Sequence, residues 1–134
     1  MDNDEAGRAR CFSVPEANLL LPEIERLLGS LRQAVQGFEE FRGLLSDGEK
    51  RPAIASDTAV PRDYFALVRV FNGAMNRIRE IGCEVKDVSR GLVDFPTLID
   101  GEQAYLCWEE GEDRIRFWHR PDAGYAGRQP LPEE

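Results

Sequence analysis

His119 is the only histidine among the 134 residues, and it lies in the stretch "DRIRFWHRPDAGYAGR" with arginines on both sides. An imidazole changes charge near neutral pH, so it can move protons or bind a metal ion. The sequence has no second histidine and no Cys-x-x-Cys pair at metal-ligand spacing, and we therefore expect no metal site. Two roles stay open for His119. We favour a structural imidazole at the end of a strand over a ligand-binding or proton-carrying group.

Polar residues near His119 fall on one face of a predicted sheet. In the strand registers given below, a row on the face turned away from the core contains Lys86, Asp94, Cys107 and Arg116. The next row contains Tyr105 and Trp118, whereas His119 falls on the core side. A row of opposite charges is typical of a solvated outer face, although aromatic rings beside charges also suit an anion or a planar ligand.

The cysteines are too far apart in the sequence for a redox or zinc motif, since they stand at Cys11, Cys83 and Cys107. We expect reduced thiols rather than a disulfide framework. Nucleophilic catalysis by Cys107 would need a base, and no second histidine supplies one. The sequence also lacks a glycine-rich phosphate loop and a serine-elbow motif, so we predict no cofactor.

Two helices precede this region. "FSVPEANLLLPEIERLL" begins with a capping box of Ser13 and Glu16, and Pro22 indicates either a kink or a fresh helix start. Beyond Pro22, apolar residues recur at three- and four-residue steps in two segments, the second of which ends at Gly82. We predict a first helical region at 11–45, a mobile connector at 46–60 and a second long helix at 61–82. The two helices form an antiparallel hairpin.

From residue 83 the apolar period becomes alternating, and three glycine-containing turns predict the strand registers. Asp100 and Gly101 as a two-residue turn place Val93 opposite Trp108. Gly111 and Glu112 as a second such turn place Trp108 opposite Ile115 and Leu106 opposite Phe117. A three-residue turn of Ser89, Arg90 and Gly91 places Lys86 opposite Asp94 and Val85 opposite Phe95.

The three turns agree on one apolar sheet face, which contains Val85, Val93, Phe95, Leu106, Trp108, Ile115 and Phe117. We therefore predict an α+β fold, in which the long antiparallel helical hairpin packs on a four-stranded antiparallel β-meander at 83–119. Pro96 cannot donate to a ladder, so we expect a bulge or an outward-facing amide position there. Residues 120–134 are expected to form a C-terminal tail strapped loosely along the domain.

The composition is that of an ordinary globular protein forming a single domain, 1–134, with 42% hydrophobic and 31% charged residues. The formal net charge of −8 disfavours nucleic acid as a partner, because that affinity rests on clustered Lys and Arg. No apolar run approaches the ~20 residues that span a bilayer, and "MDNDEAGRAR" lacks the form of a signal peptide. We expect no membrane association and a cytoplasmic location.

Several motifs resemble a known family. "FSVPEANLLLPEI", "GCEVKDVSRGLVDFP", "AYLCWEEGE" and "FWHRPDAGYAGRQPL" are similar to a family of small bacterial and archaeal proteins catalogued as a domain of unknown function, number 2203. The resemblance covers Phe12 to Leu131. It implies that a polar motif set belongs to the family pattern, namely Lys86, Asp94, Glu112, His119 and Arg128. The family has no established activity, so the set fits either buried polar pairing or a binding pocket.

Two hypotheses for the function follow. The leading one is a non-enzymatic binding or interaction module that forms a homodimer through its helical hairpin, because a short sheet leaves part of the wide apolar stripe uncovered. The alternative is a small enzyme or ligand-binding protein whose polar site on the β-meander receives an anionic small molecule. Candidate ligand-binding residues are Lys86, Asp94, Arg116, Glu112, His119, Arg128 and Trp118. Whether the protein is an enzyme stays open.

Overall fold

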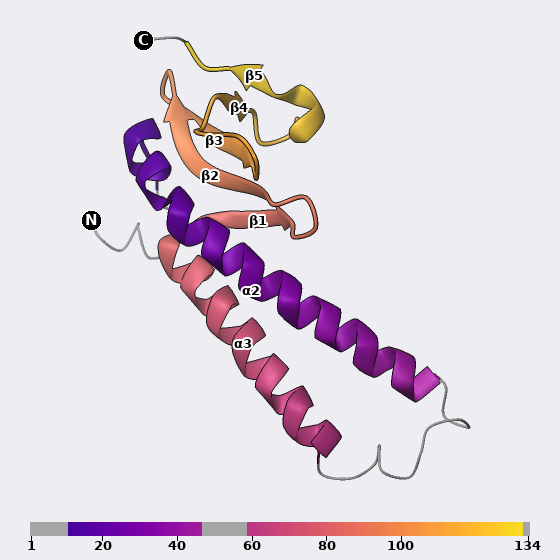
Figure 1. Ribbon diagram of the computed structural model, residues 1–134. Helices are drawn as coiled ribbons and strands as arrows, with labels where there is room; N and C mark the ends of the chain where they lie inside the picture. Colours follow the sequence, from indigo (N-terminus) through magenta and orange to yellow (C-terminus); the bar gives the residue numbers. More distant parts are fainter. Residues whose placement is uncertain (1–10, 47–58, 133–134) are drawn as a thin grey trace.

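The computed structural model describes residues 11–46 and 59–132, with side chains for 11–43 and 64–132 (Figure 1). Within these residues, two α-helices and a five-stranded antiparallel sheet form an α+β fold, in agreement with the predicted class. The connector expected at 46–60 falls almost wholly outside the described residues, so its predicted mobility stays a prediction.

The first helix, α2, spans Val14–Ser46 without interruption. Its capping box forms as predicted, because Ser13 N donates to Glu16 Oε1 at 2.9 Å and Glu16 N donates to Ser13 Oγ at 3.2 Å. Pro22 lies inside the helix, so a fresh helix start at this position is wrong. Leu21 and Ile24 are buried on either side of the proline, and one apolar stripe therefore continues through it.

The second helix, α3, spans Ala59–Ile81 and runs antiparallel beside α2 (Figure 1). Gly82, with φ 98°, ends it in the left-handed conformation that favours glycine. An ion pair joins the two helices, since Arg77 donates to both carboxylate oxygens of Glu23, at 2.6 and 3.1 Å. The predicted helical hairpin is thus present in the described residues.

The sheet has the order β1-β2-β3-β4-β5. Its strands are β1 (Glu84–Asp87), β2 (Leu92–Ile99), β3 (Glu102–Glu109), β4 (Phe117–His119) and β5 (Gln129–Pro130). The fifth strand comes from the segment predicted as a loose tail. It pairs with β4, and Leu131 N donates to Arg116 O at 2.8 Å. The C-terminal segment is therefore part of the sheet.

The central hairpin has the predicted register. Val93 lies opposite Trp108, and Ile99 lies opposite Glu102. Both turn residues have positive φ, 55° at Asp100 and 79° at Gly101, as a type I′ turn requires. Local turn chemistry therefore suffices to align β2 with β3.

The predicted pairing of β1 with β2 is wrong. Asp94 lies opposite Glu84 instead of Lys86, because the register shifts between Val85 and Asp87. The Asp87 side chain closes the turn that follows, by accepting from Ser89 Oγ at 2.7 Å and from Arg90 N at 3.1 Å. The turn thus begins one residue earlier than predicted, and the bulge at Lys86 shifts the register by one further residue.

The predicted pairing of β3 with β4 is wrong by one residue. Phe117 lies opposite Cys107, Trp118 opposite Leu106 and His119 opposite Tyr105. The connection is not a two-residue turn, because Glu112 N donates to Glu109 O at 3.0 Å and Trp108 Nε1 donates to Glu112 O at 2.9 Å. Every side chain of β4 is therefore on the opposite face from the predicted one. Phe117 leaves the apolar face, and His119 joins the outer polar face.

Pro96 lies in β2 opposite Tyr105 without a bulge. Its carbonyl accepts from Phe12 N at 2.7 Å, and Thr97 Oγ1 donates to Phe12 O at 2.7 Å. The nitrogen and carbonyl of a strand residue point to the same edge, so the missing amide of Pro96 lies outside the β2–β3 ladder. The predicted outward-facing position is confirmed.

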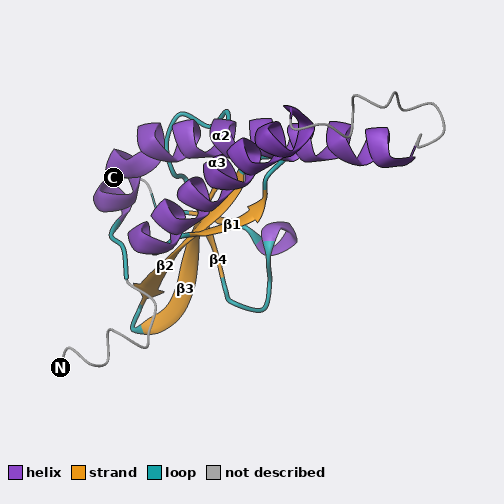
Figure 2. Ribbon diagram, turned by 90° about the horizontal axis from the view of Figure 1, so that it is seen from below, coloured by secondary structure: helices purple, strands orange, loops and turns teal. Residues whose placement is uncertain are grey.

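The core lies between the sheet and the near half of the helical hairpin. Both helices run along one side of the sheet (Figure 2), and Phe12 packs edge-to-face on Phe95 with ring centroids 5.3 Å apart. Buried members of the core include Ile24, Leu28, Leu31, Ile78, Val93, Leu106, Trp108 and Ile115. The far half of the hairpin extends beyond the sheet (Figure 1), and neither α2 nor α3 covers the opposite sheet face.

Candidate ligand-binding site

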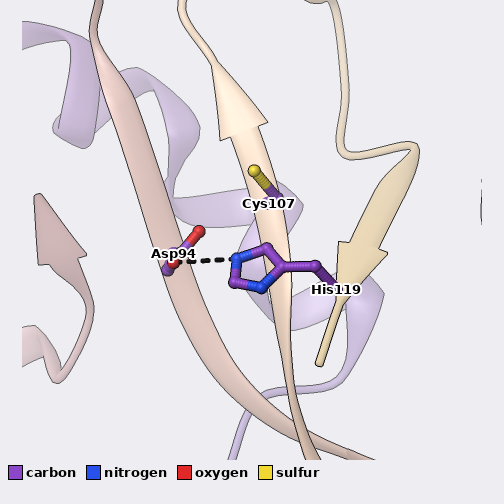
Figure 3. A group of neighbouring side chains, drawn as sticks. All are labelled: Asp94, Cys107 and His119. Atoms are coloured by element: carbon purple, nitrogen blue, oxygen red, sulfur yellow. Dashed lines mark hydrogen bonds and ion pairs between the residues drawn. The ribbon is translucent and has the colours of Figure 1, made fainter. Parts of the chain in front are cut away.

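Three potential ligand groups meet on the sheet face that the helices do not cover. Asp94 of β2, Cys107 of β3 and His119 of β4 each supply one donor atom, and these atoms lie within 4.8 Å of one another (Figure 3). All three residues are buried, with exposed fractions of 2, 1 and 3%. Oxygen, sulfur and nitrogen donors are thus held close together away from water.

The strand registers explain why these residues meet. Asp94 lies directly opposite Cys107, and His119 follows Phe117, which lies on the other side of Cys107. Alternation along β4 then places His119 on the same face as its neighbours. The predicted register placed His119 on the core side. The observed β3–β4 register differs from it by one residue and places His119 on the outer face, beside Asp94 and Cys107.

The His119 ring has a partner at each nitrogen. Nδ1 lies 2.7 Å from Arg120 O, and Nε2 lies 3.0 Å from Asp94 Oδ2. A carbonyl only accepts, so Nδ1 carries a proton and donates it. The contact at Nε2 then needs one further proton between the ring and the carboxylate. A stacked Tyr105 ring, with centroids 5.5 Å apart, holds the imidazole in this orientation.

The second oxygen of Asp94 has no such partner. Oδ1 is buried without a hydrogen bond of normal geometry, although the thiol of Cys107 lies nearby. Burial raises the pKa of Asp94, and the charges of His119 and Lys86 oppose this rise. A buried carboxylate oxygen without a partner is costly, and it marks a place where a ligand gains most by binding.

The Cys107 thiol is not activated as a nucleophile. Burial and the neighbouring Asp94 carboxylate raise its pKa to about 11. Both nitrogens of His119 are occupied by other groups, so the ring does not serve as its base. This geometry differs from a Cys–His catalytic pair, in which the ring accepts the thiol proton.

A cavity of about 290 Å³ adjoins the three residues. Its other walls include Lys86, Tyr105, Pro121 and Tyr125. A larger groove of about 610 Å³ lies between the start of α2 and β5, but its charged residues Arg114 and Arg116 are exposed and paired with Asp113. We therefore place the candidate site in the smaller cavity, where buried polar atoms lie in the wall.

The segment that covers the cavity is held by Arg128. Its Nη2 donates to both oxygens of Glu112 at 2.9 Å and to Cys107 O at 3.3 Å. The guanidinium also lies over the rings of Phe117 and Tyr125, at 4.1 and 4.7 Å from their centroids. Arg128 thus fastens the residues around η2 (Tyr125–Gly127) over the outer sheet face.

The sequence-predicted site residues separate into three groups. Asp94, His119 and Lys86 line the cavity. Glu112 and Arg128 pair with each other and support the covering segment, as described above. Arg116 and Trp118 do not line the cavity, since Arg116 pairs with Asp113 and Trp118 packs against the core.

Cys107 is not among the site residues predicted from the sequence, although its predicted position opposite Asp94 is confirmed. The prediction of no metal site rests on the spacing of ligand residues along the chain. The three donors stand 13 and 12 residues apart in the sequence and become neighbours only through strand pairing. A correct register for β4 was the signal that would have revealed the cluster.

The family model described as "Uncharacterized conserved protein (DUF2203)" matches residues 10–131. The chain belongs to the DUF2203 family. No curated protein and no solved structure matches it significantly. Within the described residues, neither helix of this DUF2203 member contains an apolar stretch suited to crossing a membrane. Membership of the family assigns no activity.

Proposed function

We propose that the protein is a small binding protein that holds a cationic or proton-donating ligand beside Asp94, Cys107 and His119. The observation that carries the proposal is the buried Asp94 Oδ1 without a hydrogen-bond partner, in the wall of a cavity. Asp94 Oδ2 is already paired with His119 Nε2 at 3.0 Å through one shared proton, so the point that lacks a partner lies at Oδ1. Such a point is satisfied by a positive charge or by a proton donor.

The charge distribution disfavours the anionic ligand that the sequence suggested. Of the expected basic residues, only Lys86 lines the cavity, and its Nζ already pairs with Glu84 Oε1 at 3.0 Å. A buried carboxylate at the same wall repels an anion. Arg128 is committed to Glu112 and Arg116 to Asp113. These pairs support a cation or donor as the ligand.

A thermal-shift panel tests this function on the full chain. The unfolding temperature is measured with divalent cations, with small amines, with hydroxyl-bearing metabolites and with metabolite anions. We expect members of the first three classes to raise it and the anions to leave it unchanged. Asp94→Asn should lose the ligand-induced shift, because it removes the carboxylate charge. Asp100→Asn makes the same change at the exposed hairpin turn and should keep the shift. Stabilisation of both variants by the same compound contradicts the proposed site.

Self-association through the helical hairpin is a second candidate function. An aromatic group of Phe38, Phe41, Tyr64 and Phe65 lies on the far half of the hairpin, beyond the sheet. Tyr64 and Phe65 are 37 and 58% exposed. An exposed aromatic group of this kind suits a symmetric contact between two copies.

Sedimentation at micromolar concentration tests this contact. We expect a dimer for the unmodified chain and a monomer for Phe65→Glu, because a charge at the exposed aromatic group opposes its burial. A monomer of 15.2 kDa for the unmodified chain rejects the self-association proposal.

We also propose a cytoplasmic location. All three cysteines are free thiols, as is usual in a reducing compartment. Recovery of the protein in the soluble cytoplasmic fraction of cells tests it, and recovery in an oxidising compartment contradicts it.

A further inference from the structure

We infer that the ligand is a divalent transition-metal ion of the zinc class, bound by Asp94, Cys107 Sγ and His119 Nε2 (Figure 3). This inference rests on the proposed binding function and names its ligand. The family and the comparisons assign no metal to these residues.

The donor types favour such an ion. A thiolate, an imidazole and a carboxylate together form a borderline-soft set, which suits Zn²⁺, Co²⁺ or Fe²⁺. Mg²⁺ and Ca²⁺ prefer shells made of oxygen atoms alone, and here Asp94 supplies the only carboxylate of the group. The donor set of the site therefore selects against Mg²⁺ and Ca²⁺.

The orientation of His119 also fits a metal ligand. A metal-bound histidine usually donates its second ring N–H to a carbonyl or a carboxylate, which fixes the tautomer. Here Nδ1 donates to Arg120 O at 2.7 Å, so the lone pair of the neutral ring lies on Nε2 and faces Asp94. Tyr105 stacks on the ring and limits its rotation.

The spacing of the donor atoms is compatible with one ion. Bond lengths of about 2.0 Å to nitrogen and about 2.3 Å to sulfur separate tetrahedral donors by about 3.3–3.6 Å. All three donor atoms lie within 4.8 Å of one another, and the His119–Asp94 contact is 3.0 Å. A metal ion in place of the shared proton requires small side-chain shifts and no change of strand register.

Three protein ligands leave the fourth tetrahedral position open. The cavity of about 290 Å³ adjoins the group, so a water molecule or a small molecule can occupy that position. Zinc sites that perform chemistry keep an open position, whereas structural zinc sites bind four protein ligands. The arrangement therefore resembles the catalytic kind of site, with Lys86 and Tyr105 in the cavity wall.

Cobalt titration of the full chain tests the inference. The chain is first treated with a chelator, kept reduced with a phosphine, and titrated with Co²⁺ alone. We expect one equivalent to produce visible bands of four-coordinate cobalt and a near-ultraviolet sulfur-to-cobalt charge-transfer band. Zn²⁺ should abolish both, and one equivalent of Zn²⁺ should raise the temperature of unfolding.

Three variants locate the ion. Asp94→Asn and His119→Gln should weaken Co²⁺ binding at least ~100-fold. Cys107→Ser should also remove the charge-transfer band. Circular dichroism of each metal-free variant shows whether it is folded, and Asp94→Asn can still donate from its amide to His119 Nε2. Cys11→Ser removes an exposed thiol elsewhere and should bind like the unmodified chain.

The possible outcomes separate this inference from the proposed function. Cobalt bands that persist in Cys107→Ser, or a chain that binds no Co²⁺ or Zn²⁺, overturn the metal assignment. If an amine or another organic donor then stabilises the chain through Asp94, the binding function still stands. If neither metals nor organic ligands stabilise it, both proposals fail.

Discussion

His119 Nε2 lies 3.0 Å from Asp94 Oδ2, and the two side chains are 4 and 3% exposed. The contact joins β2 to β4 across β3, because Cys107 lies between the two residues in the sheet. A buried pair of this kind is costly to break from one side, since the remaining partner stays buried and unsatisfied.

We predict that His119→Ala lowers the free energy of unfolding of the metal-free chain by about 3 kcal/mol at neutral pH. The loss arises mainly because Asp94 is left buried without its partner. Urea unfolding followed by circular dichroism measures it. The double variant Asp94→Ala, His119→Ala is the matched comparison, and its loss should be smaller than the sum of the two single losses. Strict additivity would show that the pair does not interact.

We predict that Gly91→Ala is more damaging than Gly101→Ala. Both glycines have positive φ, 71° and 79°, so each substitution introduces backbone strain. At Gly91 an added Cβ would also lie 2.5 Å from Glu110 Cβ, whereas nothing lies within 4 Å at Gly101. We expect losses of about 2–3 and about 1 kcal/mol by chemical denaturation. Equal losses would mean that Glu110 moves away freely.

We predict that Leu28→Ala costs more stability than Phe38→Ala. Leu28 is fully buried, whereas Phe38 is half-buried and contacts Tyr64 and Phe71 on the protruding part of the hairpin. We expect losses of about 3 kcal/mol and about 1–2 kcal/mol. The midpoints of urea unfolding measure both. If Phe38→Ala loses more stability than Leu28→Ala at a protein concentration at which the chain is a dimer, self-association buries the Phe38 ring.

We predict a pH-dependent contribution from the ion pair between the helices. The hydrogen bond from Arg77 holds the pKa of Glu23 below its ordinary value of 4.5. A lowered pKa in the folded state means that the unfolded chain takes up the proton first, so the pair stabilises the fold above pH 4.5 and is lost as the pH falls through the lowered value.

The unfolding temperature of Glu23→Gln should therefore lie below that of the unmodified chain at pH 7 and approach it in acid. Thermal unfolding monitored by circular dichroism measures the difference. Glu25→Gln removes an exposed charge from the same helix and serves as the control. A Glu23→Gln difference that stays constant from pH 7 to acid would contradict the predicted role of the pair.

The reach of sequence analysis is clearest in the two hairpins that share β3. Asp100 and Gly101 adopt positive φ within the turn itself, so the two residues alone specify the pairing of Val93 with Trp108. The helices and the apolar face of β2 and β3 were predictable for the same reason, because each depends on a local period or turn.

The second hairpin depends on contacts from distant segments. Ile115 N donates to Asn18 Oδ1 of α2 at 2.8 Å. The Glu112 carboxylate accepts hydrogen bonds from both Glu109 N and Arg128 Nη2. These contacts lengthen the connection beyond the two residues that Gly111 suggests. Local patterns do not report these contacts, and the sheet face that carries His119 was therefore predicted wrongly.

The placement of one donor group on each of three consecutive strands couples occupancy of the site to the integrity of the sheet. None of the three groups is near the others in the unfolded chain, so a bound ion stabilises the folded chain by mass action. The supply of that ion would then set how long each molecule survives proteolysis, and starvation for it would lower the amount of the protein in the cell without any change in its synthesis.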